Sequence, residues 1–213
     1  MSEVTFTQVP KRYKLSVQDG YLRFITSAAG GAATYDTKAH RLDVLKSVGL
    51  AVDASNKKIY ASGKVYDVTN NVRGGTLTVD VIAIPGEIAD EARGAVAKGA
   101  GSYDLNLPKG KEFGFGFSSK MSDSSEVYVW YPRCKLNYAN ETDETSDDSD
   151  IDPSESYEIE CMPTEEGIWR VKYYTANVEE SKTPHTMEEF VKEGLYTKAA
   201  IESFFGSETT AGG

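Results

Sequence analysis

The stretch of residues 113–162 limits the possible fold of this chain most strongly. It reads FGFGFSSKMSDSSEVYVWYPRCKLNYANETDETSDDSDIDPSESYEIECM, and aromatic residues alternate in the runs on both sides of its first polar turn. Alternation with a period of two and a high aromatic content are typical of half-buried β-strands. The stretch therefore predicts a strand, a polar turn, a second strand, a long acidic loop and a third strand.

The remaining segments predict a mainly β chain of the α+β class. Two apolar runs at residues 13–17 and 21–26 flank Gln18-Asp19-Gly20, and Asp-Gly between such runs predicts a hairpin. Further strands are expected at residues 57–61, 64–69, 76–84 and 168–175, with turns around Gly49, at Ser62-Gly63 and at residues 70–75.

Three segments predict helices. Residues 87–98 carry a narrow stripe of mostly small apolar side chains, so this helix is expected to lie close against a sheet. Thr186 and Glu189 have the spacing of a capping box, which predicts a helix that ends near Gly194. A third helix is expected at residues 197–205, ending at Gly206.

Negative charge is concentrated in one part of the chain. Residues 137–169 hold twelve of the 33 acidic residues and no Lys or Arg, which leaves 21 acidic against 23 basic residues elsewhere. The body therefore has a balanced surface without a basic stripe, and sequence-specific binding of nucleic acid is not expected. The N-terminal residues show no apolar signal region, and no stretch approaches the length of a membrane span.

The acidic loop allows two interpretations. It is a solvated insertion whose charges repel one another, or it is a negative surface that faces a partner subunit or lines a passage. The candidate residues are Glu141, Asp143, Glu144, Asp147, Asp148, Asp150 and Asp152. Asp148, Asp150 and Asp152 also match the first ligand positions of an EF-hand, but Pro153 and Ile159 occupy positions that require Gly and Glu. Only weak calcium binding remains a hypothesis there.

No catalytic pattern stands out in the rest of the chain, and no cofactor is expected. Cys134 and Cys161 lie on separate predicted strands, and we interpret them as buried small apolar residues. Gly114-Phe115-Gly116 begins a GxGxxG pattern, but Ser119 replaces the third glycine, so the glycines indicate close backbone packing. A hydrolase with paired carboxylates needs two acids about 5–10 Å apart on rigid elements, whereas these acids gather in a loop.

Two runs of the sequence resemble a known family. RGGTLTVDVIAIPGEIADEARG at residues 73–94 and FGFGFSSKMSDSSEVYVWYPRCKLN at residues 113–137 resemble the strand and helix signatures of major tail proteins of long-tailed, non-contractile phages. The similarity covers roughly residues 13–175. The chain differs from the family in the length and acidity of its loop and in the helical segment after residue 175.

The resemblance implies a β-sandwich or split-barrel tail-tube fold with one flanking helix. It implies that copies form rings, six-membered in the family, that stack into a tube for genome delivery in the virion, after assembly in the bacterial cytoplasm. The partners would be further copies of the chain and other tail proteins, such as the tape measure, tail terminator and distal tail proteins. Family members bridge successive rings with N-terminal arms and long loops, so residues 1–12, 27–52 and the C-terminal segment are candidates for this role.

These expectations divide the chain into an N-terminal arm at residues 1–12, a β domain at residues 13–175 with its acidic loop at 139–156, and a helical C-terminal extension at residues 176–213. The alternative function is a non-catalytic β-sandwich module that binds carbohydrate or protein. Such a module would expose a cluster of Trp or Tyr side chains, whereas Trp130 and Trp169 are expected in strands that pack into the core.

Overall fold

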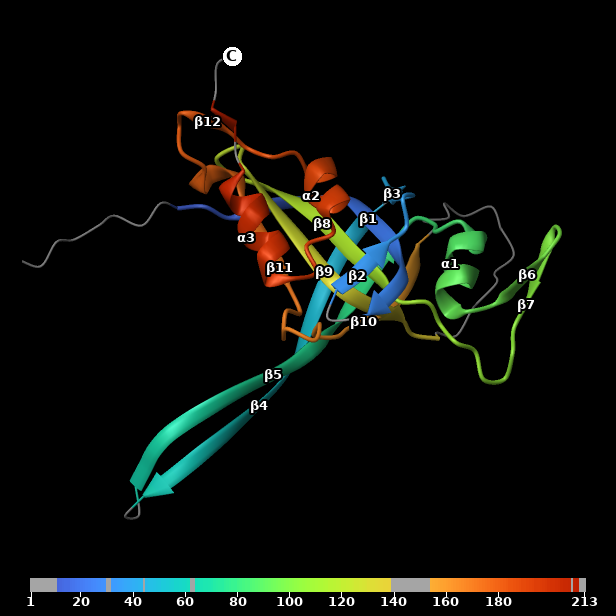
Figure 1. The fold of residues 1–213 in the computed structure, drawn as a ribbon, viewed down its shortest axis with the longest axis horizontal. Coiled ribbons are helices and arrows are strands. Elements are labelled where there is room, and N and C mark those ends of the chain that lie inside the picture. Colours follow the sequence, from blue (N-terminus) through green and yellow to red (C-terminus); the bar gives the residue numbers. More distant parts are fainter. Residues whose placement is uncertain are drawn as a thin grey trace, which may run out of the picture.

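The computed structural model describes residues 11–29, 32–43, 45–61, 64–138, 154–207 and 209–210. Within this part the chain is mainly β with antiparallel sheets, as the sequence predicts (Figure 1). In chain order, the elements are β1 (Lys14–Ala29), β2 (Ala32–Tyr35), β3 (His40–Leu42), β4 (Leu45–Ala61), β5 (Lys64–Val81), α1 (Gly86–Arg93), β6 (Val96–Lys98), β7 (Gly101–Tyr103), β8 (Phe113–Met121), β9 (Glu126–Leu136), β10 (Glu155–Cys161), β11 (Val171–Tyr174), a 3-10 turn (Thr175–Asn177), β12 (Lys182–Thr183), α2 (Met187–Glu193), α3 (Lys198–Gly206) and β13 (Thr209–Thr210).

The described strands of the main sheet follow the order β2-β1-β8-β9-β10-β5-β4, with β3 beside β1 and β11 beside β9. The sheet is strongly curved, because side chains from both of its ends pack into one core. Leu22 of β1 and Leu42 of β3 share this first core with Leu77 of β5. Helix α1 adds Ala89 and Ala92 to the same core, so its small apolar stripe does lie close against the sheet.

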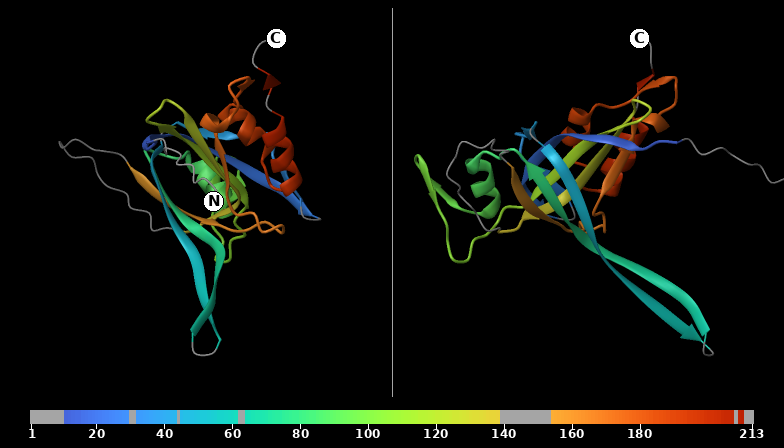
Figure 2. Two further views of the ribbon diagram at one scale, coloured as in Figure 1. Left: turned by 90° about the vertical axis from the view of Figure 1, so that its left-hand side faces the viewer. Right: turned by 180° about the vertical axis from the view of Figure 1, so that it is seen from behind.

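A second core lies on the other face of the sheet, beneath the C-terminal helices (Figures 1 and 2). Strand β9 contributes to both cores, because Val127, Val129 and Tyr131 face the first core, whereas Tyr128 and Trp130 between them face the second. The predicted aromatic strands at residues 113–162 are confirmed as β8, β9 and β10, and their aromatic side chains are buried. Phe190 of α2 and Phe204 of α3 complete the second core.

Trp130 packs directly on two glycines of the neighbouring strand. A Cβ atom on Gly114 would lie 2.2 Å from the Trp130 ring, and one on Gly116 would lie 2.6 Å from it. The indole N–H of Trp130 donates to the carbonyl oxygen of Gly194 at 3.0 Å, just after α2. The glycines are therefore explained by close packing, as the sequence indicates, and Trp130 connects the sheet to the C-terminal helices.

The C-terminal helices begin and end where the sequence predicts. Thr186 and Glu189 form the capping box at the start of α2, and Gly194 ends that helix in the left-handed conformation. The Thr197 side chain accepts the N–H of Ala200 at the start of α3, and α3 ends at Gly206. None of the helices in the described ranges is long and apolar enough to cross a membrane.

Helix α1 is shorter than predicted. It ends at Arg93 instead of residue 98, because Gly94 takes a left-handed φ of 86° and its N–H bonds to the carbonyl of Asp90. The segment Val96–Lys98 then forms β6, which pairs with β7 in a separate small hairpin. Ala95 and Val96, which fall within the helix predicted at residues 87–98, therefore lie outside α1.

The predicted hairpin around Gln18-Asp19-Gly20 is wrong. Strand β1 runs through this stretch without reversing, and the irregularity between Val17 and Gly20 in its pairing with β8 absorbs one extra residue as a bulge. The region of residues 27–52 is not a long loop either, since it holds β2, β3 and the start of β4. The predicted N-terminal arm lies mostly outside the described residues.

The predicted turns around Gly49 and at residues 70–75 are wrong as well. Strands β4 and β5 pair continuously from Leu45 opposite Val81 to Ala61 opposite Lys64. The strands predicted at residues 57–61 and 64–69 lie opposite each other at the outer end of this pair. Polar residues such as Asn70 and Asn71 fit a strand here because their side chains are exposed, so no desolvation opposes them.

We predict that Gly114→Ala destabilises the fold by about 1–3 kcal/mol, because its Cβ would overlap the Trp130 ring in a closely packed core. Urea unfolding followed by tryptophan fluorescence measures the change. Gly101→Ala is the matched control, since a Cβ on Gly101 meets nothing within 4 Å, and it should change stability by less than about 0.5 kcal/mol. Equal stability of the two variants would contradict the packing role of Gly114.

Candidate assembly surface

The most exposed part of the fold is the outer half of the β4–β5 pair, which projects away from the body (Figures 1 and 2). We call residues 51–61 and 64–73 the arm. Every arm side chain whose burial is described is exposed. At about 3.3 Å per residue, strand β4 carries the arm roughly 35 Å from the body. In the single chain the described arm side chains are therefore not covered by the body. An isolated two-stranded ribbon is only marginally stable in water, so a covering surface would stabilise the arm.

The arm has an apolar and a polar face. Residues that pair across antiparallel strands share a face, and every second residue of a strand returns to it. The register therefore gathers most of the exposed apolar side chains on one face, which contains Val52, Ala54, Tyr60, Val65, Val68 and Val72, together with Asn56, Lys58 and Asn70. The opposite face contains Asp53, Ser55, Lys57, Ile59, Asp67, Thr69 and Asn71.

The apolar face of the arm continues the core-facing side of the same strands. Closer to the body, Leu50 pairs with the fully buried Leu77, and Val48, which pairs with Val79, packs against the first core. The neighbouring strand β10 ends where Cys161 pairs with Gly75, and beyond that point the same face is exposed. The arm is thus an extension of the hydrophobic core beyond the body.

Two glycines define the base of the arm. Gly74 has a φ of 138°, and a Cβ there would lie 2.2 Å from the carbonyl oxygen of Cys161. A Cβ on Gly75 would lie 2.7 Å from the carbonyl oxygen of Ala51. A bulge follows directly, since the pairing shifts between Asp53 and Ala54. Close backbone approach and a bulge together fix where the ribbon leaves the sheet.

The outer face of the sheet is covered on only one half. The C-terminal helices cover β1, β8, β9 and β11. No described element covers the other half, whose outward-facing residues are small or polar: Ser47, Gly49, Ala51, Thr76, Thr78, Asp80, Ser156, Glu158 and Glu160. Hydrogen bonds from Ser47 and Ser156 lower the pKa of Asp80, which therefore stays ionised at neutral pH. This half carries three acids, Asp80, Glu158 and Glu160. Two lysines lie near them, because Lys46 is close to Asp80 and Lys135 pairs with Glu160, so the half has a small acidic excess.

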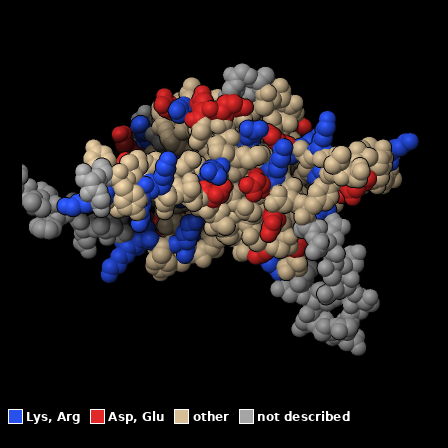
Figure 3. Space-filling model, turned by 90° about the horizontal axis from the view of Figure 1, so that it is seen from below, with Lys and Arg blue, Asp and Glu red and all other residues tan. Residues whose placement is uncertain are grey.

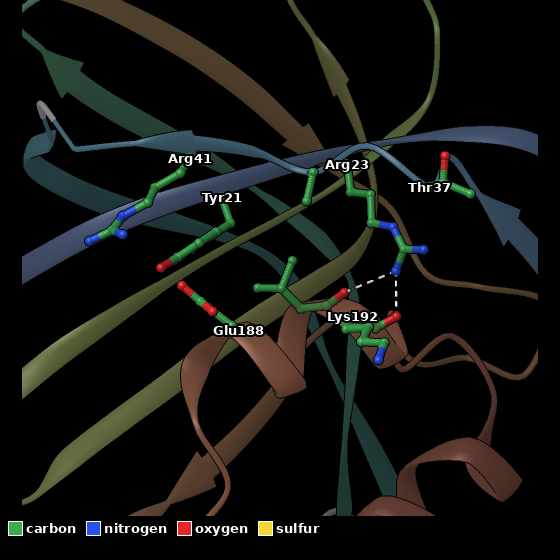
Figure 4. Close-up of a pocket in the computed structure, with 8 residues that line it drawn as sticks. Tyr21, Arg23, Thr37, Arg41, Glu188 and Lys192 are labelled. Atoms are coloured by element: carbon green, nitrogen blue, oxygen red, sulfur yellow. Dashed lines mark hydrogen bonds between the residues drawn. The ribbon is translucent and has the colours of Figure 1, made fainter.

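A pocket of about 290 Å³ lies where α2 meets β1 (Figure 4). Arg23 reaches across from β1 and donates to the carbonyl oxygens of Val191 and Lys192 in the last turn of α2. Arg41 pairs with Asp19, and the Tyr21 hydroxyl points toward Glu188 (Figure 4). Both guanidinium groups are thus paired within the chain, and the Arg23 contacts fasten the end of α2 to β1. We therefore interpret this pocket as part of the packing between helix and sheet.

The sequence-predicted site residues are only partly described. The acidic-loop candidates, including the weak calcium candidates Asp148, Asp150 and Asp152, lie outside the described residues. No group of three or more His, Cys, Asp or Glu that could hold a metal ion occurs in the part of the chain that is described. Tyr138 precedes this loop in the chain, and its hydroxyl contacts the carbonyl of Arg93 and the carboxylate of Asp104 at 3.4 Å each.

The two cysteines are brought together, as neighbours in the register of β9 and β10. Their sulfur atoms are 3.5 Å apart, both thiols are free, and both side chains are buried. Burial raises the pKa of the Cys134 thiol well above its usual value, so this thiol is a poor nucleophile at neutral pH. This agrees with the interpretation of the cysteines as small core residues.

A comparison with models of known protein families finds no match, and a search of curated proteins finds no similar sequence.

We predict that the amides of residues 54–60 and 64–72 exchange with deuterium at least about tenfold faster than those of residues 76–81. The two groups lie on one strand pair, but only residues 76–81 also pair with β10 on their other side, and Leu77, Val79 and Val81 among them pack in the core. Hydrogen exchange of the dilute protein with mass spectrometry measures this difference. Equal protection along both strands would show that the arm is stable without a covering surface.

Proposed function

We propose that the protein is a structural component that assembles from many copies, and that these copies form stacked rings of a phage tail tube. The observation that carries this proposal is the β4–β5 arm with its exposed apolar face. An extended apolar surface on a ribbon outside the body is the kind of surface that another protein molecule covers. The fold class and the resemblance of residues 73–94 and 113–137 to major tail proteins support the same proposal.

The free energies of burial and association indicate that one arm contact is weak and that an assembly needs several such contacts. Full burial of a fully exposed Val side chain contributes about 1.5 kcal/mol or more. The side chains on the apolar face of the arm are about half exposed, so this face offers roughly 4–8 kcal/mol before costs. Association costs roughly 4–15 kcal/mol in lost freedom of motion. A single arm contact is therefore marginal, whereas a ring in which each copy makes several contacts is stable.

The uncovered half of the sheet suits the wall of a passage for DNA. Its side chains are small and polar, and Asp80, Glu158 and Glu160 give it a small acidic excess. Lys or Arg contacts to phosphate would retain DNA, whereas an acidic wall lets it pass. We therefore propose that this half faces the lumen of the tube, which is net negative. The other tail proteins at the tube ends and inside it are the proposed partners.

A binding module is the second candidate function. The observation in its favour is the exposure of two tyrosines close to the tip of the arm, Tyr60 and Tyr66, of which Tyr66 is 79% exposed. Against it, Trp130 is fully buried and Trp169 packs against the first core. Negative-stain microscopy distinguishes the two functions: rings or tubes at high concentration support assembly, and a persistent monomer supports a module.

We predict that Val68→Asp raises the concentration needed for assembly by at least tenfold, or about 1.4 kcal/mol, because it places a carboxylate on the apolar face of the arm. Sedimentation velocity over a range of protein concentrations measures the change. Thr69→Asp adds the same charge at the next residue, on the polar face of the same strand, and should assemble like the wild type. Equal behaviour of the two variants would contradict the role of the apolar face.

We also predict that replacing Asp147, Asp148, Asp150 and Asp152 with Asn leaves the melting temperature unchanged and promotes assembly at low salt. In an assembly of many copies, acidic loops that repel one another oppose association, and removing four charges weakens this repulsion. The difference from the wild type should vanish near 1 M salt, where the Debye length is about 3 Å. Weaker assembly of the neutral variant at low salt would instead show that the loop binds a basic surface.

A further inference from the structure

Cys134 and Cys161 form one cross-strand pair in the main sheet. Cys134 of β9 lies opposite Cys161 of β10, their sulfur atoms are 3.5 Å apart, and both thiols are free. Both side chains belong to the first core and are buried. Two thiols this close have the arrangement of a reduced disulfide, so the geometry of the two strands decides whether the bond can form.

The hydrogen bonding next to the cysteines shows which kind of pair they make. The N–H of Met162 donates to the carbonyl oxygen of Arg133 at 2.8 Å, and these two residues are the next pair along the same ladder. Hydrogen-bonded and non-hydrogen-bonded pairs alternate along antiparallel strands. Cys134 and Cys161 are therefore a non-hydrogen-bonded pair, the kind in which facing side chains lie closer together.

This geometry lies within reach of a disulfide. Facing Cα atoms in a non-hydrogen-bonded pair are about 4.5 Å apart, and disulfides join Cα atoms that are about 4.4–6.8 Å apart. The sulfur atoms must approach by about 1.5 Å to reach bond length, and rotation of the two side chains brings them together without a change of register. A metal site is a poorer interpretation, because the described residues contain no group of three or more His, Cys, Asp or Glu that could hold an ion.

We infer that Cys134 and Cys161 form an intrachain disulfide in the folded protein when a small disulfide compound is present as the oxidant. Cys161 is the last residue of β10, so fraying of this strand end uncovers its thiol while the rest of the sheet stays folded. In the described register, β10 pairs with β9 over only three residues, against seven with β5. The opening that admits the oxidant is therefore local.

The reaction is a thiol–disulfide exchange in two steps. The Cys161 thiolate attacks one sulfur of the oxidant, a mixed disulfide forms, and the other half of the oxidant leaves as a thiolate. When the strand end closes again, the Cys134 thiolate attacks the sulfur of Cys161 and displaces the second half. The protons of the two cysteines pass to the two leaving thiolates. Two protein thiols are thus oxidised by two electrons, and the oxidant is reduced to two thiols.

The bond acts as a covalent lock on the finished fold. It closes a loop over the 26 residues between the cysteines, which include the acidic loop, and a cross-link over such a length restricts the unfolded chain. Burial raises the pKa of the Cys134 thiol, so oxidation is slow and follows folding instead of interfering with it. Neither the arm nor an assembly of copies takes part, so the disulfide is independent of the proposed function.

Charges near the pair favour an uncharged oxidant for the test. Glu158 and Glu160 face outward from β10. Seen from below, acidic and basic side chains lie side by side on the described surface (Figure 3). Because such charges attract or repel an ionic oxidant according to its sign, hydroxyethyl disulfide, which is small and uncharged, is the suitable probe.

Oxidation of the dilute folded protein with hydroxyethyl disulfide tests the inference. After incubation the protein is denatured, its remaining thiols are alkylated, and mass spectrometry counts them. The wild type should lose both thiols, yield peptides linked through Cys134 and Cys161, and melt about 5 °C or more above the reduced protein. A reductant should restore both thiols and the original melting temperature.

Single-cysteine variants are the matched controls. Cys134→Ala keeps the thiol at the strand end and should accumulate the mixed disulfide, because no second thiol displaces the bound half. Cys161→Ala should form no intrachain bond and gain no thermal stability. A wild type that keeps both thiols, retains the mixed disulfide or links two chains would overturn the inference, and this measurement does not depend on the folding of either variant. An oxidised wild type that melts no higher than the reduced protein would overturn the covalent lock.

Discussion

The packing of Trp130 on Gly114 and Gly116 is the contact on which the second core depends. The absence of Cβ atoms on these glycines leaves room for the ring against strand β8, and the indole N–H then bonds to Gly194 beyond α2. Tyr35 closes the same site with its ring against Trp130 and its hydroxyl on the carbonyl of Pro132. Because the C-terminal helices are held through this contact, they cover one half of the outer face and leave the other half, beside β5, open to solvent.

The sequence predicts the elements whose side-chain pattern is uninterrupted. Strands β8, β9 and β10 follow from alternating aromatic residues, and α2 follows from its capping box. The hairpin predicted at Gln18-Asp19-Gly20 failed because Asp-Gly serves a bulge as well as it serves a turn, and only the neighbouring strand β8 decides between them. The helix at residues 87–98 was predicted too long because a glycine inside a helical pattern does not reveal whether it adopts a left-handed φ, as Gly94 does.

The arm could not be recognised from the sequence for a related reason. Its apolar residues at positions 52, 60, 65, 68 and 72 face one side only after two register shifts are taken into account, at Asp53/Ala54 and Ile59/Tyr60. Each shift adds a residue to one strand, so the alternation in the sequence changes phase although the face is continuous. The sequence instead drew attention to the acidic loop, because charge is visible without any knowledge of the register.

The same bulges bear on how an exposed ribbon avoids non-specific aggregation. A long, flat, apolar edge strand would pair with any other strand, and β4 is at the edge of the main sheet. Register shifts at three places along β4 and β5 bend and twist the pair, and lysines at positions 57, 58 and 64 add charge near its tip. Such an edge resists unspecific pairing, yet its apolar face remains exposed and available to a partner surface. In a protein that polymerises, this combination lets single chains stay separate in dilute solution and associate through one defined contact as their concentration rises.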